Sequence, residues 1–338
     1  PFAFADSWFR MMENLYDNPS VSGLNNLAET ANDAVVRRAQ RDLENETEDD
    51  LEKESREDFA SATVGAWLKP WTTQLQREIT TINEAIAALG ITSLDPAIAP
   101  LDSRIERLIE TIDGELREGD LWRDDERMIV FTEYKTTLDY IKVKLEQHYP
   151  ESENRIALLY GGSDPNMNAQ LREKIKRRFN DPNDPVRLLL ATDTASEGLN
   201  LQTTAHRVFH FDIPWNPSRL EQRNGRLDRH GQARNVIVYH FTCEQNLDLS
   251  FLATIVNKVQ QIREDLGSMG EVFDRAFQRR LLDGEEIETV VSDLEVDIKC
   301  RQTRINIPAT NIAVMDAELL QYRTAIGFTP EAFKQFID

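Results

Sequence analysis

The chain has 338 residues, of which 40% are hydrophobic and 29% are charged, and its formal net charge is −20. This length allows two domains, or one domain with long extensions. No apolar run approaches the roughly 18 residues that a membrane span needs, and the first four residues lack the basic start and apolar core of a signal peptide. The two cysteines, Cys243 and Cys300, form no metal or disulfide pattern. These features predict a cytoplasmic protein with no membrane contact and no metal site.

The negative charge is unevenly distributed along the chain. Residues 128–243 carry 16 Lys and Arg against 14 Asp and Glu, whereas the remaining residues carry 23 against 45. The acidity therefore belongs to the flanks. The global charge does not exclude a phosphate-binding surface in the middle of the chain.

The region before this middle part, residues 1–124, is expected to be mainly helical and acidic. Residues 1–23 are interpreted as irregular. Residues 24–58 are helix-prone and rich in Asp and Glu, which favours a solvated or partly disordered face. The alternative for residues 42–58 is a docking or autoinhibitory segment that mimics nucleic acid.

Two further helices are predicted before the middle part. The first covers residues 71–90 and stops near Gly90. The second follows Asp102, a candidate N-cap, and its apolar residues recur at the i, i+3, i+4, i+7 spacing of one helix face. We expect this face to pack on the following sheet through Ile105, Leu108, Ile109, Ile112 and Leu116.

From Met128 onward, short apolar runs alternate with helical segments. This alternation is typical of a parallel sheet that helices cover on both faces, so the fold class is α/β over residues 125–245. A helical extension is predicted over residues 246–338, with clear periodicity from Leu249 to Leu266. The predicted strands are 128–131, 156–160, 186–191, 207–211 and 236–241, and the predicted helices between them are 135–148 and 165–179.

A row of arginines in residues 222–232 is the strongest functional signal. Arg223, Arg226 and Arg229 are three apart, which would place them near one face of a helix. Guanidinium groups are planar forks that stay charged and bind phosphate in two places at once. The row therefore indicates a polyphosphate site, although a solvated basic helix face is the usual alternative.

Several segments together resemble the superfamily 2 helicase-like ATPases, in the form used by Swi/Snf-type translocases. Residues 222–232 resemble motif VI, and residues 212–217 resemble the segment that precedes it in these proteins. Earlier in the chain, residues 129–134 resemble motif IV, residues 160–162 resemble the glycine turn, and residues 192–201 resemble motif V. The form Glu-Gln-Arg-x-Gly-Arg-Leu-Asp-Arg-x-Gly-Gln is most similar to the bacterial branch. That branch includes RapA-like RNA-polymerase-recycling translocases and the helicase-like proteins of DISARM phage defence.

This resemblance covers residues 125–266 and implies a RecA-like lobe with assigned roles for individual residues. Arg229 would be the arginine finger and Arg226 its partner at the γ-phosphate of ATP, with Gln222 positioning them. Arg223 is expected to pair with Glu221 or solvent. Three residues would face the nucleotide: Asp193, Glu197 and Gly198. Seven would contact nucleic acid: Thr132, Gly161, Gly162, Thr192, Asn200, Trp215 and Asn216, although Trp215 could equally be a packing wedge.

Half of the hydrolysis machinery is missing from the sequence. None of the 14 glycines is followed by Lys, so there is no phosphate loop, and residues 124–126 are interpreted as a linker because they precede a strand. The resemblance then implies the second lobe of a two-lobe motor, with ATP and Mg²⁺ held mainly by an upstream RecA-like lobe. The chain by itself is expected to be inactive.

Three functions remain open at this point. The first is half of an ATP-dependent translocase on double-stranded DNA. The second is a lobe of a strand-separating DNA or RNA helicase, which Ala195-Ser196 leaves open because many eukaryotic Swi/Snf-type proteins have Gly-Gly there. The third is a catalytically silent protein-docking module, against which the intact Gln222, Arg226 and Arg229 argue. RNA polymerase and the subunits of a defence complex are the candidate protein partners.

Overall fold

The computed structural model describes residues 2–16, 49–162, 164, 167–196, 201–214, 217–229 and 231–241, and in the C-terminal part residues 276, 279, 285–286, 289–294 and 296–297. The chain divides into two compact units. The first comprises Pro1–Pro214 and Arg219–Phe241, and the second comprises Trp215–Ser218 and Thr242–Asp338. In the second unit Arg279 forms ion pairs with Glu285 and Asp293. The periodic segment predicted over residues 249–266 lies outside the described residues.

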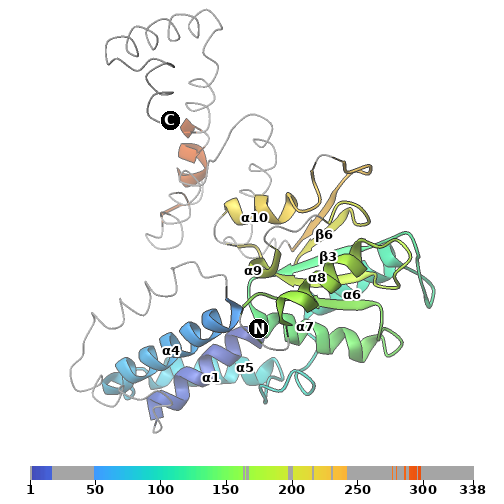
Figure 1. Ribbon diagram of the computed structural model, residues 1–338. Coiled ribbons are helices and arrows are strands. Elements are labelled where there is room, and N and C mark those ends of the chain that lie inside the picture. Colours follow the sequence, from blue (N-terminus) through green and yellow to red (C-terminus); the bar gives the residue numbers. More distant parts are fainter. Residues whose placement is uncertain are drawn as a thin grey trace, which may run out of the picture. The chain divides into compact units, whose positions relative to one another are not determined.

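A five-stranded parallel sheet forms the centre of the first unit (Figure 1). Every residue of β3, β5 and β6 is buried, which requires cover on both faces of the sheet. The predicted class, an α/β fold with a RecA-like parallel sheet, is confirmed. The strands, in the spatial order β4-β5-β3-β6-β7, are β3 (Met128–Thr132), β4 (Ile156–Leu159), β5 (Leu188–Thr192), β6 (Arg207–His210) and β7 (Ile237–His240).

The helices predicted after Asp102 and over residues 135–148 lie at their predicted positions, and the helix predicted over residues 165–179 begins at Ala169. Asp102 caps α6 by accepting hydrogen bonds from the backbone N–H groups of Arg104 and Ile105, both at 3.0 Å. All five apolar residues of the predicted stripe are buried in the same core as the strands. The helices are α6 (Ser103–Leu116), α7 (Lys135–His148), α8 (Ala169–Asn180), α9 (Asp193–Ser196) and α10 (Pro217–Asn224), and β1 (Arg117–Glu118) pairs with β2 (Leu121–Trp122) after α6.

The N-terminal part forms a second apolar cluster in the same unit. The interpretation of residues 1–23 as irregular is wrong for residues 2–16, which form a helix whose Trp8 and Leu15 lie in one apolar cluster with residues of α5, and residues 17–23 lie outside the described residues. The Trp8 indole N–H donates to Asn83 Oδ1 at 2.8 Å. Gly90, with a φ of 73°, follows α5 as predicted. The elements are α1 (Phe2–Tyr16), α4 (Asp50–Leu68), η2 (Lys69–Trp71) and α5 (Gln76–Ala88).

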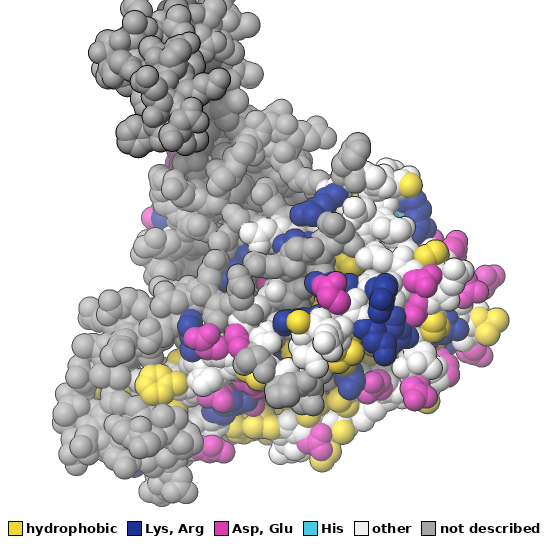
Figure 2. All heavy atoms as spheres, in the orientation of Figure 1, with side chains coloured by type: hydrophobic (Ala, Val, Ile, Leu, Met, Phe, Trp, Pro, Cys, Tyr) yellow, Lys and Arg dark blue, Asp and Glu magenta, His cyan; other side chains and the backbone are white. Residues whose placement is uncertain are grey.

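Charged side chains of both signs are interspersed over the described part of the face in Figure 2, and this mixture agrees with the near balance of charges in residues 128–243. Within the described ranges, no helix has the length and apolar character to cross a membrane. The same ranges contain no group of three or more His, Cys, Asp or Glu that could hold a metal ion.

Candidate nucleotide and nucleic-acid site

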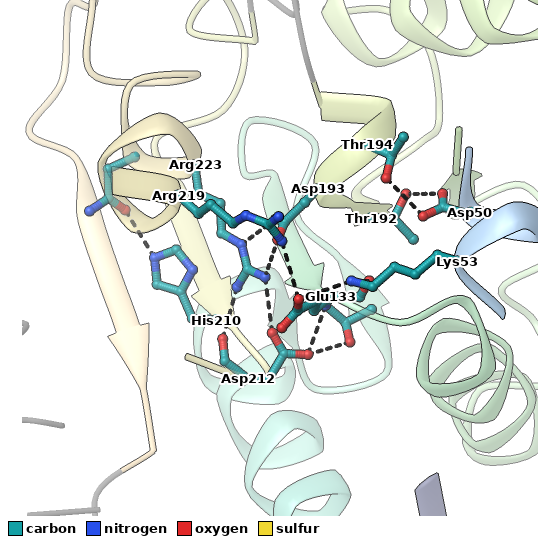
Figure 3. A network of polar contacts seen from close by, with 12 residues as sticks. Asp50, Lys53, Glu133, Thr192, Asp193, Thr194, His210, Asp212, Arg219 and Arg223 are labelled. Carbon is teal, nitrogen blue, oxygen red and sulfur yellow. Dashed lines mark hydrogen bonds and ion pairs between the residues drawn. The ribbon is translucent and has the colours of Figure 1, made fainter. Parts of the chain in front are cut away.

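The carboxyl ends of the parallel strands meet at one edge of the sheet, where polar side chains converge (Figure 3). Thr132 pairs in register with Thr192, and Phe131 with His210, so β3, β5 and β6 end together. Strand β4 lies beside β5. Ligands of open α/β sheets bind outside this edge. It is therefore the candidate site.

Arg223, in the last turn of α10, is buried at this edge between two carboxylates. Only 1% of its side chain is exposed. Its Nε and Nη2 atoms donate to the two carboxylate oxygens of Asp193 at 2.5 and 2.9 Å. Its Nη2 also donates to Asp212 Oδ1 at 3.0 Å, and its Nη1 to the Asp212 carbonyl oxygen at 2.8 Å. Arg223 therefore joins the start of α9, directly after β5, to the loop after β6.

The charge state of Arg223 follows from these partners. Burial alone lowers the pKa of its guanidinium, but the charges of Asp212 and Asp193 outweigh burial and hold the pKa above its ordinary value. The expectation that Arg223 pairs with Glu221 or solvent is wrong. Its carboxylate partners lie 30 and 11 residues away in sequence, and the residue pattern does not show which loops converge.

The three arginines of the row do not share one helix face. Helix α10 ends at Asn224, and residues 225–229 form turns, as expected for a glycine at position 225 that disfavours helix by about 1 kcal/mol relative to Ala. Arg226 is 8% exposed, and its carbonyl oxygen accepts from the Leu201 N–H at 3.1 Å. Arg229 is exposed. The row thus separates into Arg223 and Arg226, which are buried, and Arg229, which faces solvent.

A second contact fixes α10 to the sheet. His210, at the end of β6, is fully buried, and its Nε2–H donates to Asn224 Oδ1 at 2.9 Å. Burial, with a smaller contribution from the charge of Arg223, lowers the pKa of His210 to about 3. The imidazole is therefore neutral at physiological pH, and it acts as a hydrogen-bonding anchor.

The predicted nucleic-acid contact Thr132 is buried in a bond to Asp212. Its Oγ1 donates to Asp212 Oδ2 at 2.5 Å, and the Glu133 N–H donates to the same oxygen at 2.9 Å. The Glu133 carboxylate lies 3.2 Å from Arg219 and 2.9 Å from Lys53 of α4. In this structure Thr132 thus serves to orient Asp212, which in turn binds Arg223.

The glycine turn and the end of β5 converge on a carboxylate from α4. The Gly161 N–H and the Thr192 hydroxyl both donate to Asp50 Oδ2 at 2.6 Å, and the Thr194 hydroxyl donates to Asp50 Oδ1 at 2.9 Å. Asp50 is only 2% exposed. The favoured interpretation of the acidic segment as a solvated or partly disordered face is therefore wrong for Asp50.

Several residues of this edge escaped the sequence analysis. Asp212 had a usable signal, because it is an acid just beyond a buried strand, where site residues gather in parallel sheets. Thr194 lies in the motif V segment and Asp50 in the acidic segment 42–58, but no local signal pairs them, because their contact spans 144 residues of sequence. Of the residues predicted to contact the nucleotide or to position the arginines, Asp193 is bound to Arg223 and Gln222 is exposed. The remaining predicted site residues lie outside the described residues: Glu197, Gly198, Asn200, Trp215 and Asn216.

Residues 104–231 match the family model of the helicase conserved C-terminal domain. The chain is 30% identical to the ATP-dependent helicase YqhH of Bacillus subtilis over 151 residues, which are 45% of this chain and 25% of that protein. It is 28% identical to the RNA polymerase-associated protein RapA of Vibrio cholerae over 199 residues, which are 57% of this chain and 19% of that protein. The chain thus spans a quarter or less of the length of these relatives.

Among solved structures, the C-terminal part of the Fun30 ATPase domain is similar, with a TM-score of 0.37 and 14% sequence identity. The match covers 83% of this chain and 93% of that chain.

Proposed function

Residues 104–231 are the helicase conserved C-terminal domain of a Swi/Snf-type superfamily 2 ATPase, and from this we propose that the chain supplies the second motor lobe of an ATP-dependent translocase on double-stranded DNA. In this proposal a first RecA-like lobe holds most of the ATP and its Mg²⁺. The second lobe contributes arginines to the nucleotide and backbone contacts to the DNA. The protein partners proposed for the whole motor are RNA polymerase or the subunits of a phage-defence complex.

The buried contacts of Arg223 and Asn224 are the observation that carries this proposal. They anchor α10 to the loops after β5 and β6, and the exposed Arg229 follows this anchored helix by only five residues. An arginine finger acts only if its guanidinium reaches the transferring phosphoryl group in a fixed geometry. An exposed arginine that closely follows an anchored helix supports this proposed role.

The proposed roles follow from this arrangement. Arg229 is the arginine finger, Arg226 is its partner at the γ-phosphate, and Gln222 helps to position both arginines. Asp193 acts by holding Arg223, so its contribution to the nucleotide site is indirect. Glu197 and Gly198 remain proposed contacts of the nucleotide.

The proposed DNA contacts use groups that cannot read bases. The N–H of Gly161, the turn at Gly162 and the hydroxyl of Thr192 suit phosphate oxygens, which are the same in every sequence. DNA binding is therefore expected to weaken steeply as salt rises and to depend little on sequence. Asn200, Trp215 and Asn216 complete the proposed track, and Thr132 joins it only by exchanging its bond to Asp212.

The test is a set of arginine variants in a protein that contains both lobes. Arg229→Ala should lower DNA-stimulated ATP turnover by about 10³-fold with little change in duplex affinity, because the finger matters most when charge spreads over the transferring phosphoryl group. Arg229→Lys should rescue poorly, since an ammonium lacks the planar fork.

Arg234→Ala is the matched control for this set. Arg234 is an exposed arginine in the same part of the chain, and it pairs with Glu126, away from the proposed site. Its loss should leave turnover near normal. Near-normal turnover of Arg229→Ala would refute the proposed finger, and strand separation by the motor would favour the helicase alternative over the translocase.

A further inference from the structure

The first turn of α4 lies on the loops that we propose to bind DNA. Asp50 accepts three hydrogen bonds there, from Gly161, Thr192 and Thr194 (Figure 3). These three donors, which we call the oxyanion cradle, come from the ends of β4 and β5. Three of the four predicted phosphate contacts that the structure describes, namely Gly161, Gly162 and Thr192, are thus covered by one turn of helix.

The cradle has the chemistry of an oxyanion site. One backbone N–H and two hydroxyl groups point at two oxygens of a single anionic group, with donor–acceptor distances of 2.6, 2.6 and 2.9 Å. Backbone N–H and Thr hydroxyl groups are among the usual partners of nucleic-acid phosphates. A nucleic-acid phosphodiester group, like the Asp50 carboxylate, carries one negative charge that is shared by two acceptor oxygens.

The glycine turn is shaped to let an anionic segment approach its backbone. Gly162 has a φ of +107°, and a Cβ added there would lie 2.2 Å from Asp49 Oδ1 and 3.2 Å from the Asp50 nitrogen. Asp49 is also the N-cap of α4, since its Oδ1 accepts from the Leu51 N–H at 2.9 Å. Two consecutive carboxylates therefore lie against the turn, and any phosphate that enters the cradle must displace them because like charges repel.

We propose that the start of α4 mimics a nucleic-acid phosphate, and that Asp50 occupies the oxyanion cradle until a DNA phosphate displaces it. This inference rests on the proposed function, because it takes the cradle to be part of the DNA track. The start of α4 then competes with DNA for the cradle. The apparent DNA affinity equals the intrinsic affinity multiplied by the fraction of time that the cradle is empty.

Burial opposes the negative charge of Asp50 in the cradle. Gly161, Thr192 and Thr194 are neutral donors, and burial raises the pKa of the Asp50 carboxyl against the effect of these donors and of Lys53. A buried carboxylate with neutral donors is less well solvated than one in water, so its burial costs free energy. Lys53 adds a second attachment, through its ion pair with Glu133 at 2.9 Å, so α4 is held at two points of the track.

The experiment compares Asp50→Ala with a charge-matched control, Glu52→Ala. Glu52 lies in the same turn, and its side chain is 51% exposed and pairs with Arg56. Both variants remove one negative charge. The affinity of the chain for a short DNA duplex is measured at several salt concentrations. We expect Asp50→Ala to tighten binding about tenfold more than Glu52→Ala does.

A third variant shows whether the gain arises in the cradle. Adding Thr194→Val to Asp50→Ala removes one donor and should abolish part of the gain.

A measurement that needs no variant guards against misfolding of Asp50→Ala. Addition of the duplex to the unmodified chain should speed hydrogen exchange of the amides in the first turns of α4, because the segment is released.

The outcomes separate this inference from the proposed function. If Asp50→Ala binds the duplex no more tightly than Glu52→Ala, and exchange in α4 is unchanged or slowed by DNA, Asp50 is a structural anchor and the inference is refuted while the proposed function stands. If no variant and no unmodified chain binds duplex in a salt-dependent way, the DNA track itself is refuted, and the inference with it.

Discussion

Replacement of Arg223 by methionine tests whether the buried ion pairs organise the site. Methionine fills much of the same volume and keeps apolar contact with Phe131, whose ring centroid lies 5.8 Å from the Arg223 guanidinium carbon. It removes every hydrogen bond to Asp193 and Asp212. The two carboxylates then lose the cation that compensates their charge.

The magnitude follows from the burial of the three groups. Removal of one partner from a buried pair costs about 3–5 kcal/mol, because the remaining charge is left uncompensated. The Asp193 and Asp212 side chains are 17% and 23% exposed, so water relieves part of this penalty. We therefore expect Arg223→Met to lower the free energy of unfolding by about 3 kcal/mol, at the lower end of that range.

The assay is urea unfolding followed by tryptophan fluorescence and far-UV circular dichroism. The control is Arg107→Met, because Arg107 and its partner Glu110 have side chains that are 72% and 61% exposed, and such pairs contribute about 0–1 kcal/mol. Arg223→Met should lower the urea midpoint without changing the slope of the unfolding free energy against urea concentration. Asp193→Asn and Asp212→Asn in the Arg223→Met background should restore part of the stability.

A loss below about 1 kcal/mol for Arg223→Met, the range of exposed pairs, would refute this reasoning. It would mean that the two carboxylates find water or other partners when the guanidinium is absent. The absence of any recovery in the asparagine variants would refute it as well, because the penalty would then come from lost packing.

Two further predictions concern Glu57 and the chain alone. Burial, as the largest effect, raises the pKa of Glu57 from 4.5 to about 7, so the folded state binds this proton more tightly than the unfolded state does. The contribution of Glu57 to the free energy of unfolding should be fully present below pH 4.5 and be lost as the pH rises through 7, and Glu57→Gln should remove this part of the pH dependence in unfolding experiments at several pH values; an unchanged profile would count against it. The chain alone should show no DNA-stimulated ATP hydrolysis, because no glycine is followed by Lys and a phosphate loop is needed; phosphate release that duplex DNA stimulates would contradict the two-lobe proposal.

The sequence alone determined the elements whose signals are local. The strands β3 and β5 are continuous apolar runs, and the stripe of α6 begins directly after its cap at Asp102. Such patterns bury the same residues in almost any arrangement of the sheet, so they can be read without knowing the neighbours. The same holds for the family motifs, whose order along the chain is itself the signal.

Only the tertiary structure decided the position of the first helix and the partners of the buried charges. Helix α1 was missed because its apolar residues gain stability by packing on α4 and on residues of α5, which are distant in sequence. Arg223 and Asp50 carry no local mark of burial, since charged side chains are usually solvated. Their burial depends on donors and acceptors that the parallel sheet gathers at one edge from distant loops. The sequence shows which residues are charged, but only the folded structure shows which hydrogen-bond and ion-pair partners compensate each buried charge.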